Sequence, residues 1–219
     1  MIFLDKFVII CREKEKNMGD KMKRNIKKVI IFLFMLLFIF YNTVYASDSY
    51  NINFKSITID DGLSQSLAEY IYQDSLGYIW IGTNDGLNRY NGNEFKVYKN
   101  IKNNDNSISN NMISSLVEDS DKNLWIGTDG GLNKMNLLTG DITRYLVSDE
   151  DKTYSNTVVD ELLIDSKGRL WVCTINGLNL YDSENDKFIK VASEYLENKG
   201  LQDIDEDNQG NIWVSTREG

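Results

Sequence analysis

Short stretches of alternating apolar and polar residues recur along the chain from residue 67 onward. In each repeat, a stretch such as LAEYIYQ or MISSLVE leads into a polar turn that begins with Asp, and a strand-like segment around Trp follows. A turn closing at Gly then leads into GLNxY or GLNxM, and in three copies a fourth stretch follows (EFKVY, DITRY, KFIKV). Alternation with a period of two, broken by Gly, Asn and Asp, predicts short β-strands joined by tight turns.

The tryptophans give the length of the repeat. They lie 45, 46 and 42 residues apart, at Trp80, Trp125, Trp171 and Trp213. Four short antiparallel strands in about 45 residues are typical of a β-propeller blade, which must stack on neighbouring blades to cover its two faces. The sequence therefore predicts an all-β, incomplete β-propeller of four-stranded antiparallel blades behind an N-terminal signal or anchor helix. The expected blades are residues 67–98, 112–145 and 157–191, with a partial fourth blade at 200–219.

Repeated positions within the blades have predicted structural roles. We expect the indoles of Trp80, Trp125 and Trp171 to pack between blades, since one large ring fills the wedge between two diverging sheets. The small residue two places after each Trp then lies on the same strand face, where space is limited: Gly82, Gly127, Cys173 and Ser215. The next residue, always Thr, is expected to bond to turn backbone through its hydroxyl. The glycines that close these turns, Gly86, Gly131 and Gly177, are expected to supply positive φ angles.

Residues 53–59, NFKSITI, resemble the fourth-strand stretches but have no blade of their own in front of them. Propellers commonly close by letting the N-terminus supply the outer strand of the last blade, so this segment is predicted to be a ring-closing outer strand. That last blade is not among the repeats found. A four-bladed ring would lack one strand, so the chain is interpreted as a fragment of a longer propeller.

An export signal is predicted at residues 22–46. Thirteen apolar residues, 29–41, follow a cluster of Lys and Arg, and small residues precede a predicted cleavage between Ala46 and Ser47. The apolar run is shorter than the roughly 20 residues that span a bilayer, which favours a signal peptide; an uncleaved signal anchor is the alternative. Residues 1–21 fit no signal layout and are interpreted as a spurious or cytoplasmic extension, with translation beginning at Met22.

The composition of the chain excludes several classes of function. The chain has 24 basic and 33 acidic residues, and the part after residue 46 carries a net charge of −14, which opposes nucleic-acid binding. There is no His, which excludes His-containing triads, His-ligated metal centres and a phosphoaccepting histidine in this chain. Cys11 and Cys173 lie on either side of the predicted cleavage, so the exported part has no internal disulfide.

No catalytic, cofactor or metal site is predicted. Asp119, Asp121 and Asn123 have the first spacings of a calcium-binding loop, and residues 205–210 come close, but neither has Glu at its twelfth position. These Asp residues are therefore interpreted as solvated turn residues. Cys173 occupies a position used elsewhere by Gly and Ser, which indicates a small buried residue rather than a reactive thiol.

The segments DGLSQS (61–66), QDSLGYIWIGTNDGLNRYNG (73–92) and NNDNSISNN (103–111) resemble the two-component regulator propeller repeats. The resemblance extends over residues 53–219, with Lys122 in place of a turn Gly in the second copy. It implies the extracytoplasmic sensing region of a bacterial membrane protein. A β-sandwich domain, a transmembrane helix and a cytoplasmic histidine kinase or diguanylate cyclase would follow it.

These observations predict an exported, non-catalytic, ligand-sensing propeller region on the extracellular or periplasmic face, held at the membrane by a signal anchor or a downstream helix. The ligand is unknown. The resemblance favours an oligosaccharide, but Tyr154 and Tyr195 are the only aromatics in the loops at 99–111, 146–156 and 192–199 and form no stacking cluster. A homodimer of the parent protein is a further expectation. The alternative is a secreted binding or enzyme module of the quinoprotein-like class; WD-repeat scaffolds are disfavoured because the GH and WD dipeptides are missing.

Overall fold

The computed structural model describes residues 26–36, 53–145, 158–175, 177–191, 193–196 and 199–217. The chain divides into two units, Met1–Phe54 and Lys55–Gly219, and the blades lie in the second. In the first unit, residues 26–36 form a helix whose apolar side chains are largely exposed. Within the described parts of the chain, no helix combines the length and apolar character needed to traverse a bilayer. The predicted cleavage position between Ala46 and Ser47 lies outside the described residues.

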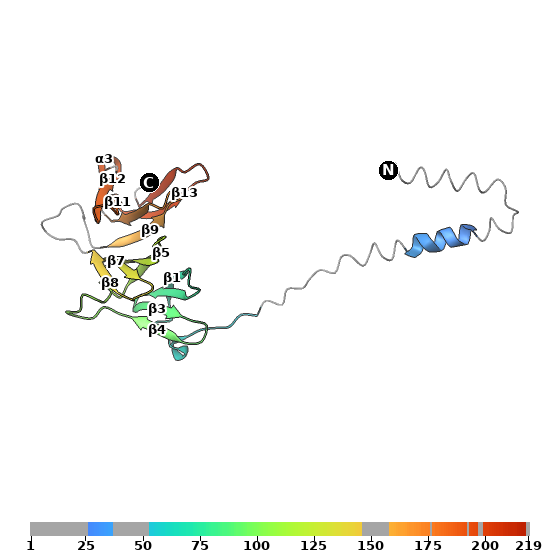
Figure 1. Cartoon of the computed structure of the whole chain (residues 1–219), viewed down its shortest axis with the longest axis horizontal. Coiled ribbons are helices and arrows are strands. Elements are labelled where there is room, and N and C mark those ends of the chain that lie inside the picture. Colours follow the sequence, from blue (N-terminus) through green and yellow to red (C-terminus); the bar gives the residue numbers. More distant parts are fainter. Residues whose placement is uncertain are drawn as a thin grey trace. The chain divides into compact units, whose positions relative to one another are not determined.

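The second unit contains three four-stranded antiparallel sheets, one for each full copy of the repeat (Figure 1). The predicted all-β architecture of propeller blades is therefore confirmed. Blade 1 consists of β1 (Ala68–Gln73), β2 (Ile79–Thr83), β3 (Gly86–Tyr90) and β4 (Phe95–Tyr98). Blade 2 consists of β5 (Ile113–Glu118), β6 (Asn123–Thr128), β7 (Gly131–Asn136) and β8 (Ile142–Tyr145). Blade 3 consists of β9 (Val159–Ile164), β10 (Leu170–Thr174), β11 (Gly177–Asp182) and β12 (Lys187–Val191).

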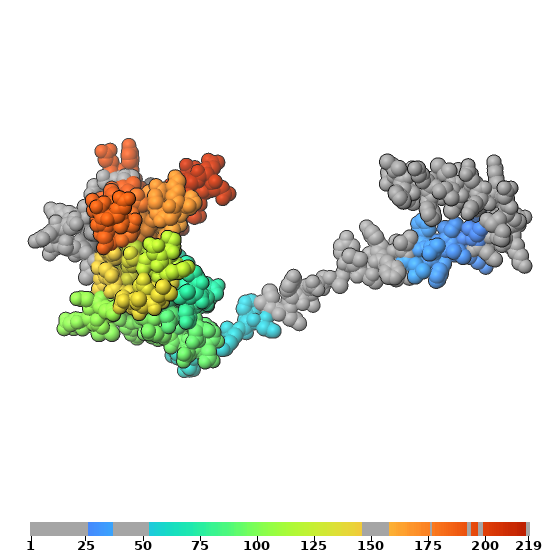
Figure 2. Space-filling view, viewed as in Figure 1, coloured from blue at the N-terminus to red at the C-terminus, as the bar shows by residue number. Residues whose placement is uncertain are grey.

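A two-stranded sheet follows blade 3. It consists of β13 (Leu201–Glu206) and β14 (Ile212–Thr216), and a short helix, α3 (Ser193–Leu196), precedes it. The inner strands β1, β5, β9 and β13 contact one another in sequence order, so the sheets succeed one another as blades do. Figure 2 shows the three blades as adjoining bands that pass from green through yellow to orange.

The core is divided among the interfaces between consecutive sheets. One cluster joins Trp80 and Leu87 of blade 1 to Ile113 and Leu116 of blade 2. Equivalent clusters surround Trp125, between blades 2 and 3, and Trp171, between blade 3 and β13. A buried indole removes on the order of 200 Å² from water, which corresponds to about 5 kcal/mol of favourable transfer free energy. The three tryptophans therefore hold the blades together, whereas Trp213 is 66% exposed because the described residues place no sheet against it.

A hydrogen bond orients each tryptophan. The indole nitrogen donates to the Asp six residues earlier, at 2.7 Å for Trp80, 2.8 Å for Trp125 and 2.9 Å for Trp171 and Trp213. The same Asp caps its own turn by accepting backbone N–H groups, as Asp165 does from Lys167 and Arg169. Burial raises the pKa of Asp165, but the hydrogen bonds from Trp171 and Arg169 outweigh it and hold that pKa below its usual value.

The segment predicted to close the ring contains no strand. Residues 53–58 have no regular structure, η1 (Ile59–Asp61) follows them, and Phe54 is 93% exposed. A strand needs a partner for its backbone hydrogen bonds, and the sheets of the described residues do not include this segment. Ring closure by residues 53–59 stays a prediction.

Candidate functional site

The features that could form a binding site lie together at one end of the blades. In an antiparallel meander, the turn between the second and third strands lies at the same end as the connection from one blade to the next. The inner strands also begin at this end. The turn after Thr83, the turn after Thr128 and the linker of residues 99–112 therefore meet there.

Threonine and glycine fix the turns at this end. The hydroxyl of Thr83 donates to the carbonyl of Gly86 at 2.9 Å and accepts from the Asp85 N–H at 3.1 Å. Gly86 has φ +125°, and a Cβ there would lie 2.8 Å from the Tyr98 carbonyl oxygen, so this position needs glycine for two reasons. Gly131 and Gly177 also have positive φ angles, 119° and 133°. Such turns hold their exposed residues in fixed positions.

In blades 1 and 2, a buried asparagine ties the segment that precedes the blade to the turn. The side-chain oxygen of Asn88 accepts from the Ser64 N–H at 2.9 Å, and that of Asn133 accepts from the Ser109 N–H at 2.8 Å. Each Ser hydroxyl also lies 2.9 Å from the hydroxyl of the turn Thr. We did not predict this role from the sequence. The available signal was the Asn of GLN in the three full copies together with a Ser ten residues before Asp74, Asp119 and Asp165.

Each inner strand is irregular close to where it begins. The register of pairing shifts between Ala68 and Tyr70, and the corresponding shift occurs in β5, β9 and β13. A β-bulge turns a side chain away from the regular alternation, and bulges are frequent beside functional sites. The residue at each shift is polar: Glu69, Ser114, Asp160 and Gln202.

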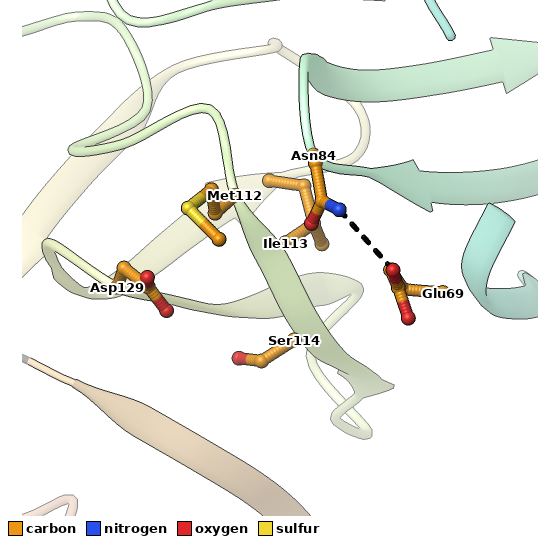
Figure 3. A pocket seen from close by; sticks show the side chains of 6 residues that line it. All are labelled: Glu69, Asn84, Met112, Ile113, Ser114 and Asp129. Carbon is orange, nitrogen blue, oxygen red and sulfur yellow. Dashed lines mark hydrogen bonds between the residues drawn. The ribbon is translucent and has the colours of Figure 1, made fainter. Parts of the chain in front are cut away.

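A pocket of about 280 Å³ opens where two of these bulges meet the turns. Blade 1 contributes Glu69 and Asn84, and blade 2 contributes residues 112–114 and Asp129. In Figure 3, Asp129 lies to one side of Met112, Ile113 and Ser114, and Glu69 and Asn84 lie to the other. The Asn84 amide donates to Glu69 at 3.2 Å, and the Ser114 hydroxyl donates to the Val159 carbonyl at 2.5 Å. The pocket therefore presents carboxylates and an apolar wall, both supplied by neighbouring blades.

The residues selected from the sequence lie elsewhere. The tryptophans and turn glycines support the blades rather than line the pocket. Tyr195 is 74% exposed on α3, and Tyr154 lies outside the described residues. The pocket residues were missed because Glu69, Ser114 and Asp129 look like ordinary strand and turn residues until the fold brings two blades together.

The carboxylate oxygens of the Asp-rich turns accept hydrogen bonds from groups of the same repeat. The carboxylate of Asp119 accepts from the backbone of Asp121 and Asn123 and from the Trp125 indole. Asp207 accepts an equivalent set from Gln209, Asn211 and Trp213. In the part of the chain that the structure describes, no group of three or more acidic or Cys side chains is placed to hold a metal ion. The geometry supports the interpretation of these residues as turn-forming.

Cys173 is fully buried in the interface between blade 3 and β13. Burial, with a smaller effect from Glu161, raises the pKa of its thiol to about 12. A thiol with so high a pKa is protonated at neutral pH and is a poor nucleophile. Its position therefore indicates a packing role.

Sequence comparison relates these repeats to a known family. Residues 62–85 and 107–130 match the family described as "Two component regulator propeller". Over these two segments the chain is therefore similar to the two-component regulator propeller repeats. The matched segments include Ser64 or Ser109, the Asp–Trp pair and the turn after Thr83 or Thr128. In the structure these are the inner two strands of blades 1 and 2, together with the turns that border the pocket.

Longer relatives carry similar repeats. The chain is 47% identical over 77 residues to "Histidine kinase P4" of Formosa agariphila, a match covering 35% of this chain and 5% of that protein. It is also similar to the solved extracellular domain of a protein of B. thetaiotaomicron assigned to the hybrid two-component systems. That match has a TM-score of 0.69 and 26% identity and covers 75% of this chain and 24% of the solved one. A second such domain from B. thetaiotaomicron, at 22% identity and a TM-score of 0.59, shares the fold.

Proposed function

We propose that this chain is the ligand-sensing part of the extracytoplasmic region of a bacterial two-component signalling protein. The observation that supports this most directly is the repeat itself. Its sequence matches the two-component regulator propeller family, and its blades superpose on an extracellular domain of the hybrid two-component class. The chain spans about 5% of the histidine kinase it matches and about a quarter of the solved domain. The output, a kinase or a cyclase, is therefore proposed for the whole protein and not for this chain.

The pocket between blades 1 and 2 is the proposed sensing site. Pockets that bind small molecules combine an apolar wall with a few converging polar groups. Here Met112 and Ile113 supply the wall, and Glu69, Asn84 and Asp129 supply the polar groups. Since the lining comes from two blades, a bound ligand would stabilise their interface. We propose that binding without catalysis is the role of this site.

Export and membrane attachment are part of the same proposal. They are supported by the basic and apolar segment at residues 22–46 and by the extracellular location of the domain that the chain resembles. Fusion of alkaline phosphatase after Gly219 tests the proposed export, because that enzyme is active only when exported. High activity is expected for the full chain and background activity for a chain starting at residue 47. Activity without residues 22–46 would contradict the proposed export.

The sensing role is tested in the parent gene of the native bacterium. Deletion of the codons for residues 67–145, which removes blades 1 and 2, is expected to abolish the transcriptional response to the stimulus. Replacement of Asn91 by Ser, in a turn at the opposite end of blade 1, is the control and should leave the response intact. A response that persists without blades 1 and 2 would show that sensing takes place elsewhere.

A further inference from the structure

The described residues that line the pocket between blades 1 and 2 carry negative charge. Glu69 and Asp129 contribute carboxylates, and no Lys or Arg is among these lining residues. The ion pairs found among the described residues involve other acids, including Asp85, which pairs with Lys99 at 2.6 Å directly beside Asn84. One acid of this turn region is thus neutralised, while the two that line the pocket are not.

The hydrogen-bonding groups of the pocket are mostly acceptors. The Ser114 hydroxyl already donates to the Val159 carbonyl, and the Asn84 amide already donates to Glu69. Since Asn84 bonds to Oε1 of Glu69, Oε2 of Glu69 and the carboxylate of Asp129 remain to accept from a ligand, and an ionised carboxylate has no hydrogen to donate. Groups of this kind are complementary to a ligand that brings N–H or O–H donors and positive charge.

The acid at the equivalent position of the next blade is already paired. The pKa of Asp160, at the equivalent bulge of β9, is raised, mainly by burial and further by the charge of Asp129, while Arg217 lowers it. Arg217 pairs with Asp160 at 3.4 Å, so the positive charge of Arg217 is already engaged there. An anionic ligand entering between Glu69 and Asp129 would meet like charges on both sides, and such contacts are unfavourable.

We infer that the pocket selects a small ligand carrying an ammonium group over neutral and anionic molecules of the same shape. The apolar wall of Met112 and Ile113 would contact the carbon skeleton of the ligand. Glu69 and Asp129 would accept hydrogen bonds from its ammonium group. The proposed sensing function supplies the reason for a ligand to be there. The preference for a positively charged ligand is a separate inference, which rests on the residues that line the pocket.

Three sugars with one ring shape and different charge test this inference: glucosamine, glucose and glucuronate. Each would be titrated into the isotopically labelled full chain at mildly acidic pH, where the amine is protonated, with the backbone NMR signals of Asn84, Ser114 and Asp129 followed. We expect glucosamine to bind several-fold to about tenfold more tightly than glucose, since exposed charge pairs contribute up to about 1 kcal/mol each. Glucuronate should bind more weakly than glucose. Added salt should reduce the differences.

Variants test which residues cause the preference for glucosamine over glucose. The double change Glu69→Gln and Asp129→Asn keeps the shape of the pocket and removes its charge, so glucosamine and glucose should then bind alike. Glu94→Gln, in the β3–β4 turn at the opposite end of blade 1, is the matched control and should preserve the preference. Equal binding of glucosamine and glucose by the native chain, or no binding of glucosamine, would overturn the inference. The phosphatase and deletion experiments would be unaffected by that result, so the two failures are distinguishable.

Discussion

The indole nitrogen of Trp80 donates a 2.7 Å hydrogen bond to the carboxylate of Asp74, and both side chains are buried. Asp74 also accepts the backbone N–H groups of Leu76 and Tyr78. One carboxylate thereby shapes a turn and orients the ring that fills the interface between blades 1 and 2. The same pair recurs as Asp207 and Trp213, where the ring is exposed.

The first prediction uses this difference in burial. Asp74→Ala leaves the buried indole N–H and the turn N–H groups without an acceptor, so the free energy of unfolding should fall by about 2–3 kcal/mol. Asp207→Ala removes an equivalent set of bonds at an exposed position, where water replaces the acceptor, so its loss should be much smaller. Urea unfolding followed by tryptophan fluorescence measures both. Equal losses for the two variants would contradict the argument from burial.

The second prediction concerns the close contact of Gly82 with Ile113. A Cβ at position 82 would lie 2.7 Å from Ile113 Cγ2, closer than side chains pack. Gly82→Ala should therefore cost about 1–3 kcal/mol of stability through overpacking. Ile113→Ala alone should cost about 2–5 kcal/mol because it leaves a cavity.

The double variant decides between overpacking and a simple backbone effect of alanine. If the clash with Ile113 is the cause, Gly82→Ala combined with Ile113→Ala should be more stable than the sum of the two losses implies. Thermal unfolding of the four proteins gives this coupling directly. Strict additivity would show that the Gly82 position is not limited by Ile113.

The third prediction is that the chain associates with itself. Ile71 in β1 is 66% exposed, although its repeat equivalents Leu116, Leu162 and Ile204 are buried against a tryptophan of the preceding blade. Trp213 is exposed by the same fraction on β14. Since an interface of this kind forms at the other blade boundaries, one copy should present β14 to the β1 of another.

Sedimentation velocity across a concentration series measures this association. Ile71→Asp should shift the chain toward monomer, because it places a charge where an apolar contact would form. Leu138→Asp, at a residue 71% exposed in the β7–β8 turn, is the matched control and should leave association unchanged. A native chain that stays monomeric at all concentrations would be evidence against this contact.

The fourth prediction concerns alkaline pH. Tyr145 of blade 2 and Tyr181 of blade 3 both donate to Asp186, at 2.7 Å and 2.6 Å. Burial, with the bond to Asp186, raises the pKa of Tyr181 from 10.0 to about 12 and raises that of Tyr145 as well. A group whose pKa is higher in the folded state stabilises the fold fully below its unfolded pKa and loses that contribution as pH rises. Stability should therefore decline from pH 10.0 toward about 12.

Urea unfolding at a series of alkaline pH values tests this decline. Tyr181→Phe removes one of the groups that titrate in this range, so the slope of stability against pH should become shallower above pH 10.0. Tyr195→Phe, an exposed position, should leave the slope as it is in the native chain. An unchanged slope in Tyr181→Phe would show that this hydroxyl does not titrate differently in the folded and unfolded states.

The sequence by itself determined the repeat, the strands and the class of fold. Tryptophans at near-constant spacing, with Asp before and Gly after, carry that information locally, because a strand and its turn depend on residues only a few positions apart. The burial of Trp80, Trp125 and Trp171 followed from the same pattern, since a blade must cover its faces. Local patterning also explains why the turn glycines could be identified.

The tertiary structure alone decided where the pocket lies and what lines it. Glu69 and Asp129 are 60 positions apart in the chain, and only the packing of blade 1 against blade 2 gives them a common cavity. The bulges that present Glu69 and Ser114 depend on strand register, which neighbouring strands set together. Contacts between blades depend on residues far apart in the chain, such as Gly82 and Ile113, which are 31 positions apart, so local patterning could not predict the binding surface.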